Sequence, residues 1–378
     1  MTSSKALTSG VKNFIKKQPV LFAALIAMTV TCFLVPPDSE YAGYFNMKTL
    51  ATLFCTLAVV AAFSHIHTFE ILAKSIILRF HTLKNVTTAL VFITFFGSMV
   101  LANDMALLTF LPLGYLVLDK TDNHKAMAFT FIMQNIAANL GGMLTPFGNP
   151  QNLYLYAYYN IPTAEFMQIM FPPFLAATIM IVICCLFVPD TPLTLVKDDD
   201  FVPDKKRTVI YTLLFIFSIL IVFRIVNHYV GTAVVIIFLL ILDRRALKEV
   251  NYPLLLTFSA FFVFSGNLAR LPVVNDFFSD LLPRNTLLIG ILSCQVISNV
   301  PSAVLLSHFT DNYSALLPAV NIGGCGTLIA SLASLITFTE FRRHNDSRAV
   351  RTYLARFTLL NILFIAVLYI VEAVVLRY

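Results

Sequence analysis

The stretch from Asn139 to Leu153, N-L-G-G-M-L-T-P-F-G-N-P-Q-N-L, constrains the fold of this chain most strongly. It lies within apolar sequence long enough to cross a bilayer, yet glycines, prolines and amides crowd its centre. Pro146 and Pro150 each remove a backbone N–H donor, so a continuous helix is not expected here. In lipid, broken backbone is stable only where it is buried in protein or lines a cavity. The stretch therefore predicts an interrupted membrane helix.

A second stretch repeats this pattern later in the chain. From Asn321 to Leu335 the sequence reads N-I-G-G-C-G-T-L-I-A-S-L-A-S-L. Both stretches contain Asn, an aliphatic residue, Gly-Gly, a Thr three positions further on, a small residue three positions after that, and a final Leu. Paired interruptions in two halves of a membrane protein point to the binding site of a secondary transporter. We therefore expect a transporter built from two related halves.

The composition excludes an ordinary soluble domain, because 58% of the residues are hydrophobic, 12% are charged and the mean hydropathy is +0.82. The residues behind the net charge of +6 fall in loops between apolar runs, which indicates membrane orientation and no nucleic-acid partner. Neither G-x-x-x-x-G-K-[ST] nor H-E-x-x-H occurs, so ATP-driven transport and zinc proteolysis have no support. The six cysteines match neither a disulfide framework nor a zinc site. No cofactor is expected beyond a coupling ion.

The predicted fold class is an all-α polytopic membrane protein. Lysines within residues 1–17 indicate a cytoplasmic N-terminus and a protein of the cell (inner) membrane. Residues 189–228 read as a cytoplasmic linker followed by a joining span. Continuous spans are predicted at about 18–36, 48–64, 167–188, 208–226, 230–242, 258–271 and 352–375.

Two further apolar runs are predicted to be re-entrant hairpins. The first breaks at Asn103-Asp104, a polar pair that would be very costly facing lipid, and the second breaks at Ser298-Asn299. A broken helix follows each hairpin. We expect the two hairpins at about 86–118 and 285–307, and the two broken helices at about 126–160 and 313–340.

Counting crossings from a cytoplasmic N-terminus, the first hairpin enters from inside and the second from outside. The halves 18–188 and 229–376 are therefore predicted to be inverted repeats, with the two hairpin tips near the bilayer midplane. The segments 65–84 and 272–284 suit helices that lie in the membrane interface. They could act as arms in an alternating-access mechanism, in which a core moves against a framework of continuous spans.

The hairpin tips and helix breaks bring unpaired backbone groups into the membrane. Half-helix N-termini offer N–H donors and partial positive charge, which favour an anion. Carbonyl groups and the amides of Asn103 and Asn299 suit Na⁺, which prefers oxygen ligands. The alternative is that these Asn and Gly residues only support kinks and helix packing.

Three motifs resemble the ion transporter superfamily, which includes citrate and divalent-anion symporters, arsenite permeases and sodium/proton antiporters. They are N-D at the first tip, T-P-F-G-N-P-Q-N in the first break, and S-N-V-P at the second tip. The resemblance covers about Met47 to Tyr159 and Tyr252 to Phe338. It implies a membrane carrier with two inverted repeats.

In the sodium/dicarboxylate branch of this superfamily, a tip Asn, a hydroxyl five residues before it and a carbonyl in the broken helix hold Na⁺. The resemblance assigns these roles to Asn103, Ser98 and Gly148. In the second half it assigns Asn299 and Ala330, with Cys294 in place of the hydroxyl. Cysteine is a poor ligand for a hard cation, so this second site departs from the pattern.

The branch also uses a hydroxyl after each tip Asn to contact substrate carboxylates, and this chain has Asp104 and Val300 there. Asp104 could carry a coupling proton, bind Na⁺ or cap the hairpin. Neutral polar residues line the predicted midplane, without Lys or Arg. The predicted substrate-binding residues are Asn103, Asp104, Thr145, Asn149, Ser298, Asn299, Thr327 and Ser331, with Gln151 and Ser334 as further lining.

Other polar residues favour structural roles. An interfacial position explains two histidines, headgroup contact explains an Arg and a Glu near helix ends, and interhelical hydrogen bonding explains a Gln-Asn pair. These residues are His65, His67, Arg224, Glu372, Gln134 and Asn135.

Three classes of function are compatible with the chain to different degrees. The first is a carrier for a small anion or oxyanion, of the citrate or dicarboxylate kind, coupled to Na⁺ or H⁺. The second is a sodium/proton antiporter or an arsenite-type efflux permease on the same scaffold. A membrane enzyme is disfavoured, because no base–nucleophile pair or metal cluster lies at membrane depth. A channel is disfavoured, because it would not need two inverted broken repeats. The expected partners are the lipid bilayer and a small-molecule or ion substrate, and a homodimer remains open.

Overall fold

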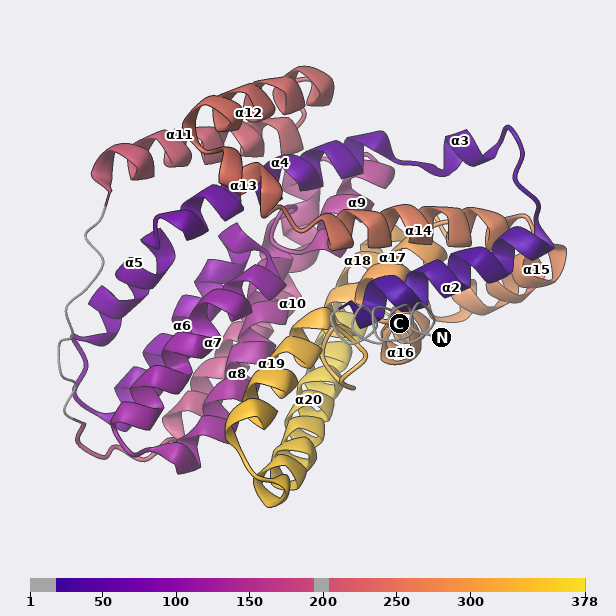
Figure 1. The fold of residues 1–378 in the computed structure, drawn as a ribbon. Helices are drawn as coiled ribbons and strands as arrows, with labels where there is room; N and C mark the ends of the chain where they lie inside the picture. Colours follow the sequence, from indigo (N-terminus) through magenta and orange to yellow (C-terminus); the bar gives the residue numbers. More distant parts are fainter. Residues whose placement is uncertain (1–17, 194–203, 378) are drawn as a thin grey trace, which may run out of the picture.

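The structure is a computed structural model that describes residues 18–193 and 204–377 (Figure 1). The predicted cytoplasmic N-terminus, residues 1–17, and linker residues 194–203 lie outside the described part. Within the described ranges the regular structure is helical, apart from an isolated bridge between Thr82 and Pro192. The predicted all-α polytopic fold class is confirmed.

Five helical segments of the described chain are long and apolar enough to cross a membrane: Met47–His65, Leu83–Leu101, Thr163–Leu186, Arg244–Ala269 and Ser347–Leu376. Shorter apolar helices accompany them. The helices at the predicted continuous spans are α2 (Pro19–Leu34), α4 (Met47–His65), α10 (Thr163–Leu186), α11 (Lys205–Val222), α12 (His228–Leu242), α14 (Tyr252–Ala269) and α20 (Ser347–Leu376).

Each predicted hairpin consists of two helices joined by a single residue. The pairs are α6 (Leu83–Leu101) with α7 (Asn103–Lys120), and α16 (Thr286–Ile297) with α17 (Asn299–Leu306). The joining residues are Ala102, at φ 66° and ψ 156°, and Ser298, at φ 75° and ψ 158°. The α6 helix, with 19 residues, is long enough to cross a bilayer, whereas α16, with 12, is not. Helix length alone therefore does not distinguish a re-entrant hairpin from a pair of spans, and the contacts at the two tips are described below.

The two broken helices stop at glycines, and they restart at a proline in the first case and at a capping serine in the second. The first consists of α8 (His124–Gly141), the 3-10 turn η1 (Gly142–Leu144) and α9 (Pro150–Tyr158). The second consists of α18 (Tyr313–Ile322) and α19 (Leu332–His344). Pro150 starts α9 because its missing N–H is not needed in a first helical turn. Ser331 caps α19 by accepting the Ser334 N–H at 3.2 Å.

Short helices connect the long ones. They are α3 (Tyr41–Tyr44), α5 (Thr68–Ile77), α13 (Arg244–Lys248), α15 (Pro272–Leu281) and the 3-10 turn η2 (Leu282–Arg284). The helices α5 and α15 lie in the two segments predicted to be interfacial arms. None of the α15 residues is buried, although Phe278 stacks on Phe309.

Helices from both halves pack together around the breaks. In Figure 1, α6, α7 and α8 run side by side, with α19 beside α7 and α8. The α4 helix packs against α9 and against α11 to α13, while α14 packs against α2 and α17. At the end of α14, Arg270 pairs with Asp38 at 2.7 Å, and its guanidinium holds the pKa of that carboxyl below its usual value. Each half thus sets one continuous helix, α4 or α14, against its own interrupted elements.

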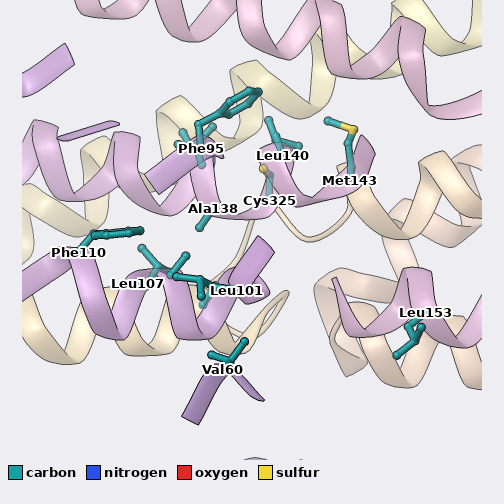
Figure 2. Close-up of a cluster of buried hydrophobic side chains, with 14 of the residues drawn as sticks. Val60, Phe95, Leu101, Leu107, Phe110, Ala138, Leu140, Met143, Leu153 and Cys325 are labelled. Atoms are coloured by element: carbon teal, nitrogen blue, oxygen red, sulfur yellow. The ribbon is translucent and has the colours of Figure 1, made fainter. Parts of the chain in front are cut away.

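Apolar packing holds the first hairpin against the first break (Figure 2). Leu101 and Leu107 flank the tip, Phe95 and Phe110 come from the hairpin helices, and Met143 comes from the turn that follows α8. All five are 3% exposed or less. Since a core Leu or Phe replaced by Ala costs about 2–5 kcal/mol, this packing fixes the hairpin firmly.

The backbone of Ala102 at the first tip is strained, and this strain can be tested by substitution. Ala102 occupies a region that only glycine enters easily, at a cost of about 1–3 kcal/mol. We expect Ala102→Gly to raise the thermal stability of the detergent-purified protein by about 1 kcal/mol, because relief of strain exceeds the added flexibility of glycine. The matched control is Ala106→Gly inside α7, which should lower stability by at least about 0.5–1 kcal/mol. A loss of stability in Ala102→Gly like that in the control would contradict this account.

Candidate functional site

The first hairpin tip lies directly on the first break. The Asn103 Nδ2 donates to the Asn139 Oδ1 at 3.0 Å. The Thr145 Oγ1 donates to the carbonyl of Met99, near the end of α6, at 3.1 Å. Ser98 lies against Gly141, where a methyl group would come within 2.7 Å of the Ser98 Oγ. Three contacts thus fix the first tip to the first break.

The second tip contacts the second break in the same way. The backbone N–H of Asn299 donates to the carbonyl of Ala330 at 2.9 Å. The Thr327 Oγ1 donates to the carbonyl of Gln295 at 3.1 Å, although Thr327 itself is exposed. Cys294 lies against Gly323, where a methyl group would come within 2.7 Å of the Cys294 Sγ. The threonine and glycine contacts repeat those of the first half at the positions that the sequence repeat pairs.

The two tip asparagines also cap their helices alike. The Asn103 Oδ1 accepts the backbone N–H of Asp104 at 2.9 Å, and the Asn299 Oδ1 accepts that of Val300 at 2.9 Å. The Ser298 Oγ donates to the Ala330 carbonyl at 3.3 Å. Both asparagines are less than 5% exposed. Their side chains are therefore held in place before any ligand arrives.

A network of amides joins the two halves. The Asn321 Oδ1 accepts from the Asn149 Nδ2 at 3.0 Å and from the Gln151 Nε2 at 3.3 Å. The Asn321 Nδ2 donates to the Asn152 Oδ1 at 2.6 Å and to the carbonyl of Leu317 at 2.8 Å. Because a backbone carbonyl can only accept, this last bond fixes the orientation of the Asn321 amide. The first break is thus bonded to the helix that leads into the second.

The two tips approach each other at Gly324. A methyl group at this position would lie 3.0 Å from the Asn299 Nδ2 and 3.4 Å from the Asn139 Oδ1, the atom that accepts from Asn103. A further hydrogen bond between the two halves runs from the Asn135 Nδ2 of α8 to the Ser334 Oγ of α19 at 3.3 Å. The two tips and the two breaks therefore form one buried region.

Some acceptors in this region have no partner. The Asn149 Nδ2 donates to the Asn139 carbonyl at 3.0 Å as well as to Asn321, so its Oδ1 faces elsewhere. The Asn149 Oδ1 and the Gln151 Oε1 are buried without a hydrogen bond within the described chain. Unpaired buried acceptors are costly, so they favour a cation or a donor from a ligand.

Small cavities adjoin both tips. A cavity of about 90 Å³ lies beside the second tip, lined by Asn299, Val300 and Leu332 and by Thr257 of α14. A cavity of about 10 Å³ lies beside the first tip, where Ala102 and Asn149 face α4. The site is nearly closed, with more room at the second tip.

Asp104 lies in the first turn of α7 and is 5% exposed. Within the described chain its carboxylate accepts no hydrogen bond from another side chain. Such a group is costly when ionised unless a cation or a donor joins it. The lack of a side-chain donor is consistent with a bound proton or a bound cation, and the capping role stays a third prediction.

The predicted Na⁺ ligands of the first half lie in one neighbourhood with separate partners. The Ser98 Oγ donates to the Phe95 carbonyl at 2.8 Å, and the Asn103 amide faces Asn139. Gly148 packs closely on the Gly142 carbonyl and the Thr145 Oγ1. Their role as ligands stays a prediction.

Sequence reasoning missed the roles of Asn139, Asn321 and Asn152. The first two open the repeated stretches, so the repeat itself carried the signal that they matter. Asn152 follows Pro150 inside α9, and nothing in the sequence shows that its Nδ2 reaches the carbonyls of Gly142, Met143 and Thr145.

Two of the residues given structural roles have partners within the protein. Arg224 turns inward, donating to the carbonyl of Tyr156 at 2.5 Å and lying 4.3 Å from the centre of its ring. His65 contacts Asp243 at 2.8 Å and also contacts Glu249. Arg224 thus has partners within the protein in place of the expected headgroup, while the interfacial position of His65 stays a prediction.

The Gln-Asn pair of α8 makes the expected interhelical hydrogen bonds. Gln134 donates to the Thr94 Oγ1 at 3.0 Å, and Asn135 bonds to Ser334 as described above. This prediction is confirmed.

The comparison with known protein families agrees with this geometry. The family described as citrate transporter matches residues 14–318. The chain belongs to the citrate transporter family. It is 35% identical to an uncharacterised transporter of Methanocaldococcus jannaschii over 297 residues, 77% of this chain and 80% of that protein. It is 28% identical to the inner membrane protein YbiR of Escherichia coli over 330 residues, 86% of this chain and 87% of that protein.

Membership in this family makes the protein an integral membrane transporter and not an enzyme. It implies a membrane environment and a small-molecule or ion substrate. The buried region where the hairpin tips and helix breaks meet is therefore the candidate transport site.

The glycines under the tips give a direct test of that region. In Gly141→Ala and Gly323→Ala the added methyl group would collide with the neighbouring hairpin. We expect each change to destabilise the transporter by about 1–3 kcal/mol, as overpacked cores do, and to reduce transport. Gly43→Ala is the matched control, because nothing lies within 4 Å of its added methyl group. Thermal unfolding and uptake in proteoliposomes measure both effects, and wild-type behaviour of both variants would contradict the packing described here.

Proposed function

We propose that the transporter is a secondary active carrier for a small carboxylate or oxyanion, of the citrate or dicarboxylate kind. The observation that carries this proposal is the convergence of two hairpin tips and two helix breaks on one buried region. Such a region supplies polar backbone groups without fixed charge at the place where a substrate would bind. The description of the family as citrate transporters supports the same class of substrate.

An anion suits this region because four helices begin there. They are α7, α9, α17 and α19, whose caps are Ala102, Asn149, Ser298 and Ser331. Helix N-termini carry a partial positive charge of about half an elementary charge and present free N–H groups. Of these caps, only Ser331 uses its own side chain to satisfy such an N–H. The first-turn N–H groups of α17 are already paired, because Asn299 donates to the Ala330 carbonyl and the Asn299 side chain accepts from Val300, so the donors left for a ligand lie at α7, α9 and α19.

Na⁺ or H⁺ would drive transport as the coupling ion. Ser98, Asn103 and Gly148 would bind Na⁺ in the first half, and the unpaired Asn149 oxygen adds a further acceptor nearby. In the second half Asn299 and Ala330 would contribute, while Cys294 weakens that site. Asp104 would bind the proton if H⁺ is the coupling ion.

The mechanism proposed is alternating access by two inverted repeats, residues 18–188 and 229–376. The core of hairpins and broken helices would move against a framework of continuous spans, with α5 and α15 as the connecting arms. The repeated tip contacts support a common design of the two halves. The N-terminus would face the cytoplasm, and a homodimer would be one possible assembly.

A sodium/proton antiporter or an arsenite-type efflux permease is the second candidate. The isolated carboxylate of Asp104 favours it, because exchange of Na⁺ for H⁺ at one carboxylate needs no further anion. Counterflow in proteoliposomes separates the two. We expect exchange of citrate or succinate across the membrane, whereas exchange only of arsenite, or only of Na⁺ against H⁺, would select the second candidate.

Asp104→Asn identifies the coupling ion. If Asp104 carries the proton, the variant should keep counterflow and lose accumulation driven by a pH gradient, because Asn mimics the protonated form. If Asp104 binds Na⁺, the variant should need more Na⁺ at an unchanged pH dependence. Asp119→Asn at the exposed end of α7 is the matched control and should leave both unchanged. Normal coupling in a stable Asp104→Asn protein would remove Asp104 from the mechanism.

A further inference from the structure

A second carboxylate lies buried in the protein, far from both hairpin tips in the sequence. Glu372, near the end of α20, is 0% exposed. Neither of its carboxylate oxygens has a hydrogen-bond partner within the described chain. Headgroup contact, which the sequence favours, does not occur, because the side chain turns into the protein. Its position therefore calls for another explanation.

The buried face of α20 is mainly apolar or aromatic. Tyr353, Phe357, Phe364 and Leu368 share this face with Glu372 and are buried apolar or aromatic residues. An ionised carboxylate without a partner is far more costly in such surroundings than a protonated carboxyl. The physical chemistry of the position thus favours a bound proton.

The helices packed against α20 bring no charge that would neutralise Glu372. Near this end, Glu165 of α10 accepts from the Tyr313 hydroxyl of α18 at 2.7 Å, so these two groups satisfy each other. From α16, the cap residue Asn285 donates to the Tyr369 hydroxyl of α20 at 3.2 Å. The titratable side chain of α16, Cys294, lies against Gly323 at the second break.

The charged groups of α8 and α19 gather at the opposite end of α20. Asn345, which precedes α20, contacts Met127 in the first turn of α8 at 3.5 Å, so the start of α8 and the end of α19 lie there. The charged or titratable groups at that end are His124, Lys125, Glu340, Arg342, Arg343 and His344. None of them forms an ion pair with Glu372 in the described chain.

The same helix also reaches the second break. The Asn361 Oδ1 of α20 accepts the backbone N–H of Gly326 at 3.2 Å. Gly326 has φ +117°, a conformation that other residues rarely adopt, so this bond supports a constrained turn of the break. Glu372 lies about 16 Å along the helix from Asn361, at 1.5 Å per residue. One rigid helix therefore connects the carboxyl to the candidate site.

We propose that Glu372 is a proton-binding site of the transport cycle. The inference rests on the proposed function as an ion-coupled carrier and adds a second proton site to it. In the conformation described here the carboxyl keeps its proton. When movement of α20 against its neighbours admits water, the O–H bond breaks, the proton passes to water and the carboxylate becomes solvated.

The test compares two variants with the wild type. Glu372→Gln keeps the shape and cannot titrate. Glu372→Met replaces the unpaired carboxyl by an apolar side chain of similar size, so it should fold at least as stably as the wild type. Glu165→Gln, at the same end of the neighbouring helix and bonded to Tyr313, is the matched control.

Accumulation driven by a pH gradient and counterflow are measured on the same proteoliposomes, with citrate and succinate as probes. We expect both Glu372 variants to lose at least tenfold in pH-driven accumulation while counterflow stays within twofold of the wild type. Glu165→Gln should keep both activities. Wild-type accumulation in either Glu372 variant would overturn the proposal.

A spectroscopic measurement keeps the test independent of the substrate. The infrared spectrum of the purified wild-type protein at neutral pH should contain a carbonyl stretch of a protonated carboxyl that is missing in Glu372→Gln. If citrate and succinate are not transported but this band is found, the proposed substrate class fails and the proton site stands. If the two spectra agree, the proton site is wrong whatever the protein transports.

Discussion

The fold depends on one constraint: in a membrane, a broken helix needs partners for its free backbone groups. This chain breaks two helices and turns two hairpins within apolar sequence. It meets the constraint by placing each tip on a break, where threonine hydroxyls, asparagine amides and carbonyls satisfy one another. Glycines at the contact points allow the helices to approach closely enough for these bonds.

Hydrogen bonds between amide side chains connect the two halves of the protein. Asn321 bonds to three side chains of the first break, so neither break can move without affecting the other. Amides are suited to this position, because they offer donors and acceptors without charge that a bilayer would penalise. In an alternating-access cycle, such a network would let the two breaks move as one body, while α4 and α14 stay with the framework.

Much of the fold could be predicted from local sequence. Prolines and glycines fix where the helices stop, and long apolar runs fix the spans, so the tips at Ala102 and Ser298 and the break before Pro150 fall where the sequence places them. The site was predictable in outline, since Asn103, Thr145, Asn149 and Asn299 all lie at the meeting of tips and breaks. The helix bounds differ by up to six residues, because capping depends on local turns.

Partners across the chain could not be predicted. The bonds of Asn321 to Asn149 and of Arg224 to Tyr156 join residues far apart in sequence, and no periodicity encodes them. Glu372 shows the same limit, since its place near a helix end is compatible both with headgroup contact and with full burial. Only the packing of α20 against its neighbours decides between these positions.

The central claim is that both tips and both breaks form a single ligand site. Hydrogen–deuterium exchange of the reconstituted transporter, with and without the anion that exchanges in counterflow, tests it most directly. The account predicts slower exchange at both tips and both breaks together, around residues 98–104, 142–150, 294–300 and 323–332, while the exposed helix α15 remains unchanged. Protection confined to one half, or found only outside these segments, would contradict it.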